Sequence, residues 1–120
     1  MTKKLTPIEK WIKALRSGKY KQCKNYLHIK DDGYCCLGVA SELYRKETKL
    51  GNWKQDDPNS NHLIFQVNGD QSRLYLIKQV YEWLGYQSEY FTRKYANLND
   101  EGQTFKYIAD KIEKDFLTNK

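Results

Sequence analysis

Residues 32–44 read DGYCCLGVASELY and combine a turn, a change of hydrophobic period and two adjacent cysteines. Residues 31–33, Asp-Asp-Gly, predict a tight turn, after which Tyr34 and Cys35 can pair back on the preceding segment as a short strand. Over residues 36–46 the apolar positions recur at helical spacing, which predicts a largely buried helix. Its apolar side consists of Cys36, Leu37, Val39, Ala40, Leu43 and Tyr44.

An amphipathic helix is predicted upstream of this stretch. Thr6 can cap it, Pro7 suits its first position, and Glu9 stands where a capping box places its carboxylate. Gly18 is the natural end of this helix. A single apolar stripe with i, i+3, i+4, i+7 spacing is formed by Ile8, Trp11, Ile12 and Leu15.

Between the two helices, the period of residues 19–30, KYKQCKNYLHIK, changes towards two, which predicts a strand or an extended segment. Its apolar face is expected to hold Cys23, Leu27 and Ile29. The opposite face is expected to hold Tyr20, Gln22, Lys24, Tyr26, His28 and Lys30. The pattern therefore predicts that tyrosine rings and positive charges share one surface.

The middle of the chain is richer in polar residues. Residues 49–62 contain many turn formers and predict a surface loop, with Trp53 as a possible anchor for it. Asn68-Gly69 predicts a two-residue hairpin, because it follows an alternating apolar run. That run consists of Leu63, Phe65 and Val67.

Two more helices are expected in the last third. One covers residues 76–84 and ends at Gly85, and the other is capped by Thr104. Residues 86–98 favour no single element. The chain is thus predicted to form one compact α+β domain over residues 1–120, with three to five helices and a small antiparallel sheet or hairpins.

The charge of the chain is concentrated at one end. Residues 1–30 hold nine Lys or Arg and one acid, Glu9, whereas the other ninety residues hold twelve bases and fourteen acids. This asymmetry indicates an anionic partner, although a solvated lysine surface explains it equally well. No long apolar run or secretory leader is present, and the three cysteines are an odd number, so we expect a cytoplasmic protein without a membrane partner.

Four patches of sequence resemble a family of small uncharacterised proteins encoded by bacteriophages and prophages. They are Trp11 with Leu15-Arg16-Ser17-Gly18-Lys19-Tyr20, then Cys35-Cys36-Leu37-Gly38-Val39, then Trp83-Leu84-Gly85, and then Leu98-Asn99-Asp100 with Gly102, Thr104-Phe105 and Ile108-Ala109-Asp110. The resemblance implies a viral accessory protein in the cytoplasm of the bacterial host. It implies no particular activity and no functional residues for this chain. The chain departs from the family pattern between Leu50 and Tyr75.

The cysteines admit three interpretations. Cys35 near a helix start, with His28 across a turn, could form a thiol nucleophile. A zinc site from Cys23, His28, Cys35 and Cys36 has enough donors, but its spacing matches no common ligand pattern. Packing is favoured, because cysteines are often small buried residues and Gly38 indicates a close helix contact. We therefore predict no metal and no cofactor.

Other candidate chemistry is explained by turns. The pairs Asp31-Asp32 and Asp56-Asp57 stand beside turn formers, and the side chains of Asn99-Asp100 can bond backbone amides ahead of the last helix. Phosphate-loop, dinucleotide-binding, zinc-protease and nucleophile-elbow motifs are absent from the sequence. The sequence thus predicts a protein that is not an enzyme.

The leading hypothesis is that this phage accessory protein binds an anionic nucleotide-type ligand, for example a nucleotide signal of bacterial antiviral defence. Lysines can contact phosphates, and tyrosine rings can stack on bases, although tyrosines also cover the edge of a core. The predicted ligand-binding residues are Arg16, Lys19, Tyr20, Lys21, Lys24 and Tyr26.

Three alternatives remain open. The protein could be an inhibitor that docks onto a host protein through Trp53 and the hairpin at Asn68 and Gly69. It could bind single-stranded nucleic acid in general, with strong salt dependence. A thiol enzyme is the least favoured alternative. Association with a second copy of the chain is compatible with each of them.

Overall fold

The computed structural model describes residues 4–118, with side chains up to residue 116. Five α-helices and a five-stranded antiparallel sheet form one domain, which confirms the predicted α+β class. The elements are α1 (Pro7–Arg16), β1 (His28–Ile29), β2 (Gly33–Tyr34), α2 (Cys36–Thr48), β3 (Asn52–Gln55), β4 (His62–Val67), β5 (Asp70–Ser72), α3 (Lys78–Leu84), the 3-10 helix η1 (Glu89–Thr92), α4 (Arg93–Asp100) and α5 (Phe105–Thr118).

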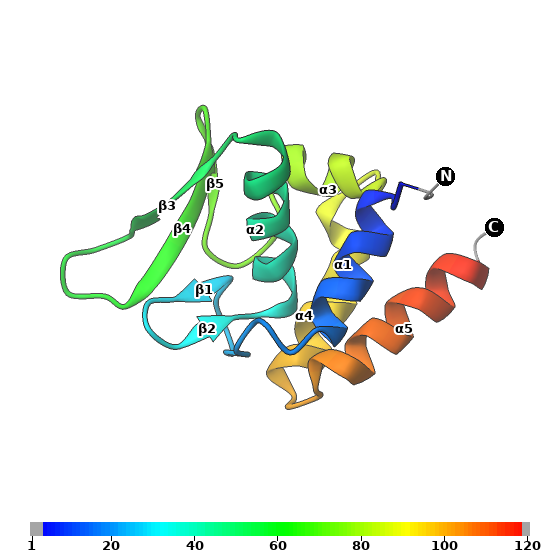
Figure 1. The fold of residues 1–120 in the computed structure, drawn as a ribbon. Helices are drawn as coiled ribbons and strands as arrows, with labels where there is room; N and C mark the ends of the chain where they lie inside the picture. Colours follow the sequence, from blue (N-terminus) through cyan, green and yellow to red (C-terminus); the bar gives the residue numbers. More distant parts are fainter. Residues whose placement is uncertain (1–3, 119–120) are drawn as a thin grey trace.

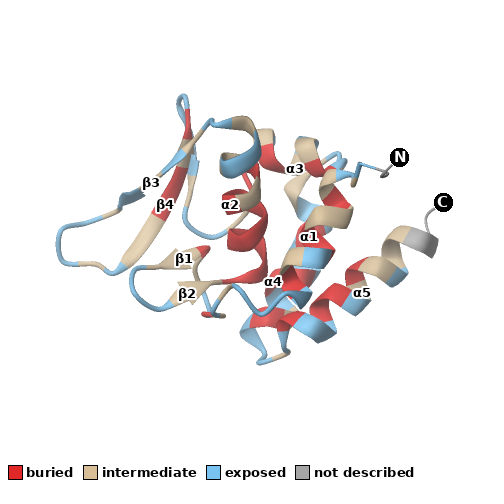
Figure 2. Cartoon of the chain, viewed as in Figure 1, coloured by how far each residue is buried: buried red, intermediate tan, exposed pale blue. Residues whose placement is uncertain are grey.

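Helix α2 lies between the sheet and the other helices (Figure 1). It is buried along most of its length, as Figure 2 shows, whereas α1 and α5 each bury one stripe. The predicted stripe of α1 is buried, and its capping box is present: the Glu9 amide donates to Thr6 Oγ1 and the Thr6 amide donates to Glu9 Oε1. The Trp11 indole joins α1 to α2 by donating to the Cys36 carbonyl at 2.9 Å.

Strand β4 holds the sheet together. The sheet order is β2-β1-β4-β3. One edge of β4 pairs with two strands: β1 pairs with residues 62 and 63, and β5 pairs with residues 65–67. The turn at residues 31–33 and the hairpin at Asn68-Gly69 are both confirmed, and Asn68 has the left-handed φ of 57° that a tight turn requires. Side chains of Phe65 and Val67 face α2 and are buried, because alternate residues of a strand point to opposite faces.

Two predictions about extended segments need correction. Residues 19–30 are extended only in part: Gln22 forms an isolated bridge with Tyr34, and His28 and Ile29 form β1. Asn25, between these two parts, adopts a left-handed φ of 74° that interrupts the extended backbone. The predicted surface loop at residues 49–62 contains β3, which pairs with β4 along its whole length. Backbone hydrogen bonds to β4 stabilise β3. Trp53 is the single large apolar residue of β3, so its sequence has no apolar alternation that would predict a strand.

The last third largely follows the prediction. Helix α3 begins at Lys78, two residues later than expected, and the undecided segment 86–98 forms η1 and most of α4. Thr104 caps α5 as expected, by accepting from the Tyr107 amide at 3.1 Å. None of the helices in residues 4–118 has both the length and the apolar character needed to cross a bilayer.

Gly38 lets α2 approach the segment before β1 very closely. A Cβ at this position would lie 1.8 Å from the Leu27 carbonyl oxygen, far inside any allowed contact. The same carbonyl accepts a hydrogen bond of 3.0 Å from the Cys35 amide. The close approach that Gly38 was expected to mark is therefore confirmed, and it fixes the start of α2 against residue 27.

Candidate functional site

Four half-buried rings gather where the sheet meets α2, and we call Tyr20, His28, Tyr34 and Trp53 the aromatic cluster. His28 and Tyr34 are cross-strand neighbours whose rings stack with centroids 3.8 Å apart. Trp53 of β3 approaches His28 edge-on at 4.9 Å, and Tyr20 approaches Tyr34 edge-on at 5.5 Å. His28 Nδ1 donates to the Gly33 carbonyl at 2.6 Å, which fixes the orientation of the imidazole.

A buried carboxylate on α2 supports this cluster. Glu42 accepts from the Trp53 indole at 2.9 Å and from two nitrogens of Arg45 at 2.8 and 2.7 Å. Burial opposes ionisation of Glu42, but these hydrogen bonds from Arg45 and Trp53 lower its pKa below the ordinary value. The Glu42 carboxylate is therefore ionised at neutral pH and holds the Trp53 ring in place.

Positive charge borders the aromatic cluster. The Lys46 ammonium lies 5.4 Å from the centre of the Tyr20 ring and donates to the Tyr20 hydroxyl at 3.2 Å. It forms no ion pair within the described residues. Lys21, whose carbonyl accepts from the Tyr34 amide, contacts Asp32 at 3.5 Å through its exposed ammonium. The cluster thus combines flat rings with a lysine that makes no direct ion pair among residues 4–116, although the Glu42 carboxylate attracts it over a longer distance.

Tyr26 lies on the opposite face of the sheet. Its ring stacks on His62 with centroids 4.2 Å apart and an interplanar angle of 4°. His62 pairs with Ile29, whereas the next residue, Leu63, pairs with His28 of the aromatic cluster. Because neighbouring strand residues point to opposite faces, the predicted common surface for Tyr20 and Tyr26 is wrong. The left-handed turn at Asn25 redirects the chain between them.

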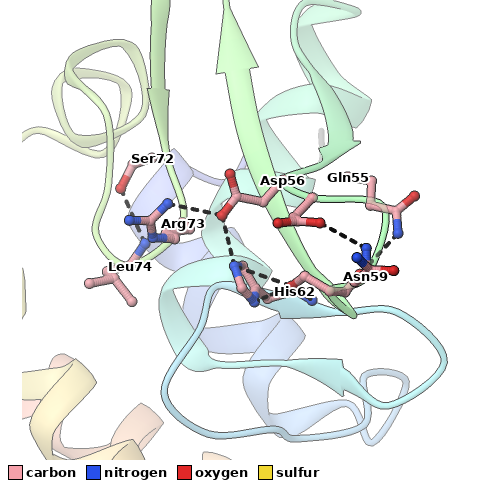
Figure 3. Close-up of polar contacts among 9 residues, drawn as sticks. Gln55, Asp56, Asn59, His62, Ser72, Arg73 and Leu74 are labelled. Atoms are coloured by element: carbon pink, nitrogen blue, oxygen red, sulfur yellow. Dashed lines mark hydrogen bonds and ion pairs between the residues drawn. The ribbon is translucent and has the colours of Figure 1, made fainter.

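Polar side chains surround His62 on this outer face (Figure 3). Asp56 Oδ2 accepts from His62 Nε2 at 2.8 Å and from Arg73 Nη1 at 2.9 Å. These contacts lower the pKa of Asp56, chiefly through the hydrogen bond from His62. The Ser60 hydroxyl contacts the other nitrogen of His62, so hydroxyl, imidazole and carboxylate follow one another as in a nucleophilic relay.

The same contacts have a local structural role. Ser60 Oγ also accepts from the His62 amide, and the Ser60 amide donates to the Asp57 carbonyl, which together close the connection between β3 and β4. Asp57 in turn accepts from the Asn59 amide, so this aspartate serves the turn as predicted. Within the described residues, no group of three or more His, Cys, Asp or Glu side chains is arranged to hold a metal ion.

The remaining predicted ligand-binding residues are dispersed. Arg16 points to α5, where it contacts Asp110 at 2.7 Å and Glu113 at 3.2 Å, and these hydrogen bonds raise its pKa. Lys19 and Lys24 are exposed. Arg16 therefore tethers two helices instead of joining the aromatic cluster, whereas Tyr20 is part of the cluster and Lys19 and Lys21 are its neighbours in the sequence.

The residues predicted to dock onto a host protein do not share one exposed surface. Trp53 is not an exposed anchor, because its ring packs on Phe65 and its indole nitrogen is bonded to Glu42. Asn68 and Gly69 are exposed at the hairpin tip. The sequence reasoning missed the Glu42 network, although Glu42 and Arg45, three residues apart in a predicted helix, were a usable signal for an ion pair.

The three cysteines are buried and lie in or beside the core. Burial raises the pKa of Cys23 to about 11, raises that of Cys35 to about 12 and raises that of Cys36 well above the ordinary value. These surroundings favour neutral thiols and are consistent with the packing interpretation.

We expect iodoacetamide to modify these thiols much more slowly in the folded protein than in denaturant, because the thiolate is the reactive form and burial suppresses it. Mass spectrometry of the intact protein after timed exposure measures the difference. Labelling of Cys35 in the folded protein at the rate seen in denaturant would contradict the packing role.

The chain was compared with protein families, curated proteins and solved structures. A family model described as a domain of unknown function, DUF8296, matches residues 1–116. No curated protein and no solved structure matches the chain. The matched region includes every residue of the aromatic cluster and of the polar group around His62.

Proposed function

The chain belongs to the DUF8296 family, a domain of unknown function, and we propose that it is a non-enzymatic binding protein for an anionic nucleotide-type ligand. The observation that carries the proposal is the position of Lys46 at the partly exposed Tyr20 ring, without an ion-pair partner among the described residues. A phosphate would replace the Tyr20 hydroxyl as a stronger acceptor for this ammonium. Lys19 and Lys21, next to Tyr20 in the sequence, would add to the attraction.

The rings of the aromatic cluster supply the second part of the argument. Tyr20, Tyr34 and Trp53 are each partly exposed, and the Glu42 and His28 hydrogen bonds already fix their surroundings. A base that stacks on such a ring gains about 1–3 kcal/mol. Because the rings are held before binding, little side-chain entropy is lost when a base stacks on them.

The biological context of the proposal rests on the resemblance to small bacteriophage and prophage proteins. A virus-encoded binder of this class would act in the cytoplasm of the bacterial host. Sequestration of a nucleotide signal used in antiviral defence fits a small protein without a proposed catalytic group. This role needs tight binding and slow release of the ligand, but no chemistry.

A charge-reversal experiment tests the proposed site. The double variant Lys21→Glu with Lys46→Glu is expected to lose at least about tenfold in affinity for nucleoside phosphates, which corresponds to about 1.4 kcal/mol. The double variant Lys78→Glu with Lys106→Glu carries the same change in net charge on exposed lysines of α3 and α5. Calorimetry with a panel of mononucleotides and cyclic dinucleotides, with mass spectrometry of co-purified material, measures the effect.

The outcomes separate the alternatives. Equal binding by the double variant and its control would place the ligand elsewhere, and no binding by the natural chain would overturn the nucleotide class. Similar affinity for every oligonucleotide, falling steeply with salt, would indicate general single-strand binding. A protein partner captured at high salt would favour docking onto a host protein, for which the hairpin tip at Asn68-Gly69 is the exposed predicted part.

A further inference from the structure

A hollow of 320 Å³ lies between the start of α1, the end of α3, η1, α4 and α5, and it shares no residue with the aromatic cluster. Its volume is at the lower end of the range of about 300–1,000 Å³ that is typical of small-molecule sites. Leu84, Phe91 and Phe116 supply apolar surface. Phe91 is 50% exposed, although large aromatic side chains are normally covered.

A hydrogen-bonded group of polar side chains lines the same hollow. The buried Tyr95 hydroxyl donates to Asp115 Oδ2 at 2.7 Å, and the Lys94 ammonium contacts the same oxygen at 3.0 Å. Burial opposes ionisation of Asp115, but the hydrogen bonds from Tyr95 and Lys94 lower its pKa. The Tyr86 hydroxyl interacts with that of Tyr95, and burial raises the pKa of Tyr86 to about 12. The carboxylate is therefore ionised and held in a fixed orientation.

The hydrogen-bonding capacity of this group is incomplete. Both contacts converge on Asp115 Oδ2, and Oδ1 accepts no hydrogen bond from the described residues. Lys94, whose side chain is 56% exposed, has further N–H groups available to a ligand. An acceptor and a donor thus stand side by side at the hollow. Asp115 and Lys94 form an ion pair with balanced charges, and Lys111 acts on Asp115 only as a more distant positive charge.

We propose that this hollow binds a neutral planar heterocycle that carries a hydrogen-bond donor beside an acceptor. The donor bonds Asp115 Oδ1, the acceptor takes a hydrogen bond from Lys94, and the ring packs on Phe91. A neutral ligand is favoured over an ion because the pair already compensates its own charge. The site is independent of the nucleotide-type site proposed above, which lies at the sheet.

The test uses 7-azaindole, a neutral bicyclic heterocycle with an N–H next to a ring nitrogen. Titration into the 120-residue chain is expected to shift amide signals at the end of α3 and in η1 and α4 in two-dimensional NMR spectra. The comparison probe 1-methylindole has the same kind of fused bicyclic ring, with a methyl group on its nitrogen, and it lacks both the N–H donor and the ring-nitrogen acceptor. It is expected to bind at least about tenfold more weakly, a difference of about 1.4 kcal/mol.

The variants are placed at exposed positions, so that a loss of ligand binding does not result from a loss of folding. Phe91→Ala and Lys94→Met are each expected to weaken 7-azaindole binding at least about threefold, whereas Tyr107→Ala is the control. Tyr107 is an exposed aromatic residue of α5, and it neither lines the hollow nor appears among the ring contacts of Phe91. Absence of binding, equal binding of the two probes, or unchanged binding by both Phe91→Ala and Lys94→Met would overturn the proposal.

Discussion

Replacement of Gly38 by alanine is expected to destabilise the protein by at least about 3 kcal/mol, because the new methyl group overlaps a backbone carbonyl. The Leu27 oxygen lies 1.8 Å from the position of the added carbon. Backbone cannot rotate away as a side chain can, so α2 must move relative to residue 27. That movement breaks the hydrogen bond from the Cys35 amide and opens the packing around Leu27, which is fully buried.

Urea unfolding followed by circular dichroism measures this loss. Gly69→Ala is the matched control, because a Cβ at Gly69 meets nothing within 4 Å and the position has no left-handed φ. The control is expected to stay within about 0.5 kcal/mol of the natural chain. An unfolding midpoint for Gly38→Ala equal to that of Gly69→Ala would show that α2 does not approach Leu27 so closely.

The second large effect is expected for Asn99→Ala, at about 3–5 kcal/mol of lost stability. The Asn99 side chain is fully buried and joins three segments that are distant in the sequence. Its Oδ1 accepts from the Cys36 amide at 3.1 Å and from Gln22 Nε2 at 2.9 Å, and its Nδ2 donates to the Cys23 carbonyl at 2.8 Å. Alanine leaves these groups without that partner, away from water.

Asn97→Ala is the control for this prediction. Asn97 lies two residues earlier on the same helix and is exposed, so its truncation is expected to cost less than about 0.5 kcal/mol. Thermal and urea unfolding of both variants give the comparison. Equal stability of the two variants would mean that the Asn99 contacts contribute little to the folded state.

Local signals in the sequence predicted the helices well. The capping box at Thr6 and Glu9, the stripe of α1 and the Asn68-Gly69 turn each depend on residues within a few positions of one another, and each is confirmed. The burial of Cys36 and the close contact at Gly38 also followed from residue type. These features need no knowledge of where distant segments lie.

The candidate site was harder to predict because it depends on distant segments. The period of residues 19–30 placed Tyr20 and Tyr26 together, but one left-handed residue, Asn25, sends them to opposite faces of the sheet. Lys46 joins Tyr20 across 26 positions in the sequence. Asn99 was expected to serve a turn, whereas its contacts to the Cys36 amide and Cys23 carbonyl depend on tertiary packing.

Strand β3 has β4 as a neighbour on one side only, which leaves a row of backbone donors and acceptors along its other edge. Such an edge is a template for unwanted pairing between molecules in concentrated solution. The strand is four residues long and carries Lys54, and both short length and lysine charge discourage intermolecular strand addition. Because this segment is polar, its sequence predicted a loop. The same polar composition disfavours pairing of the β3 edge with a second molecule.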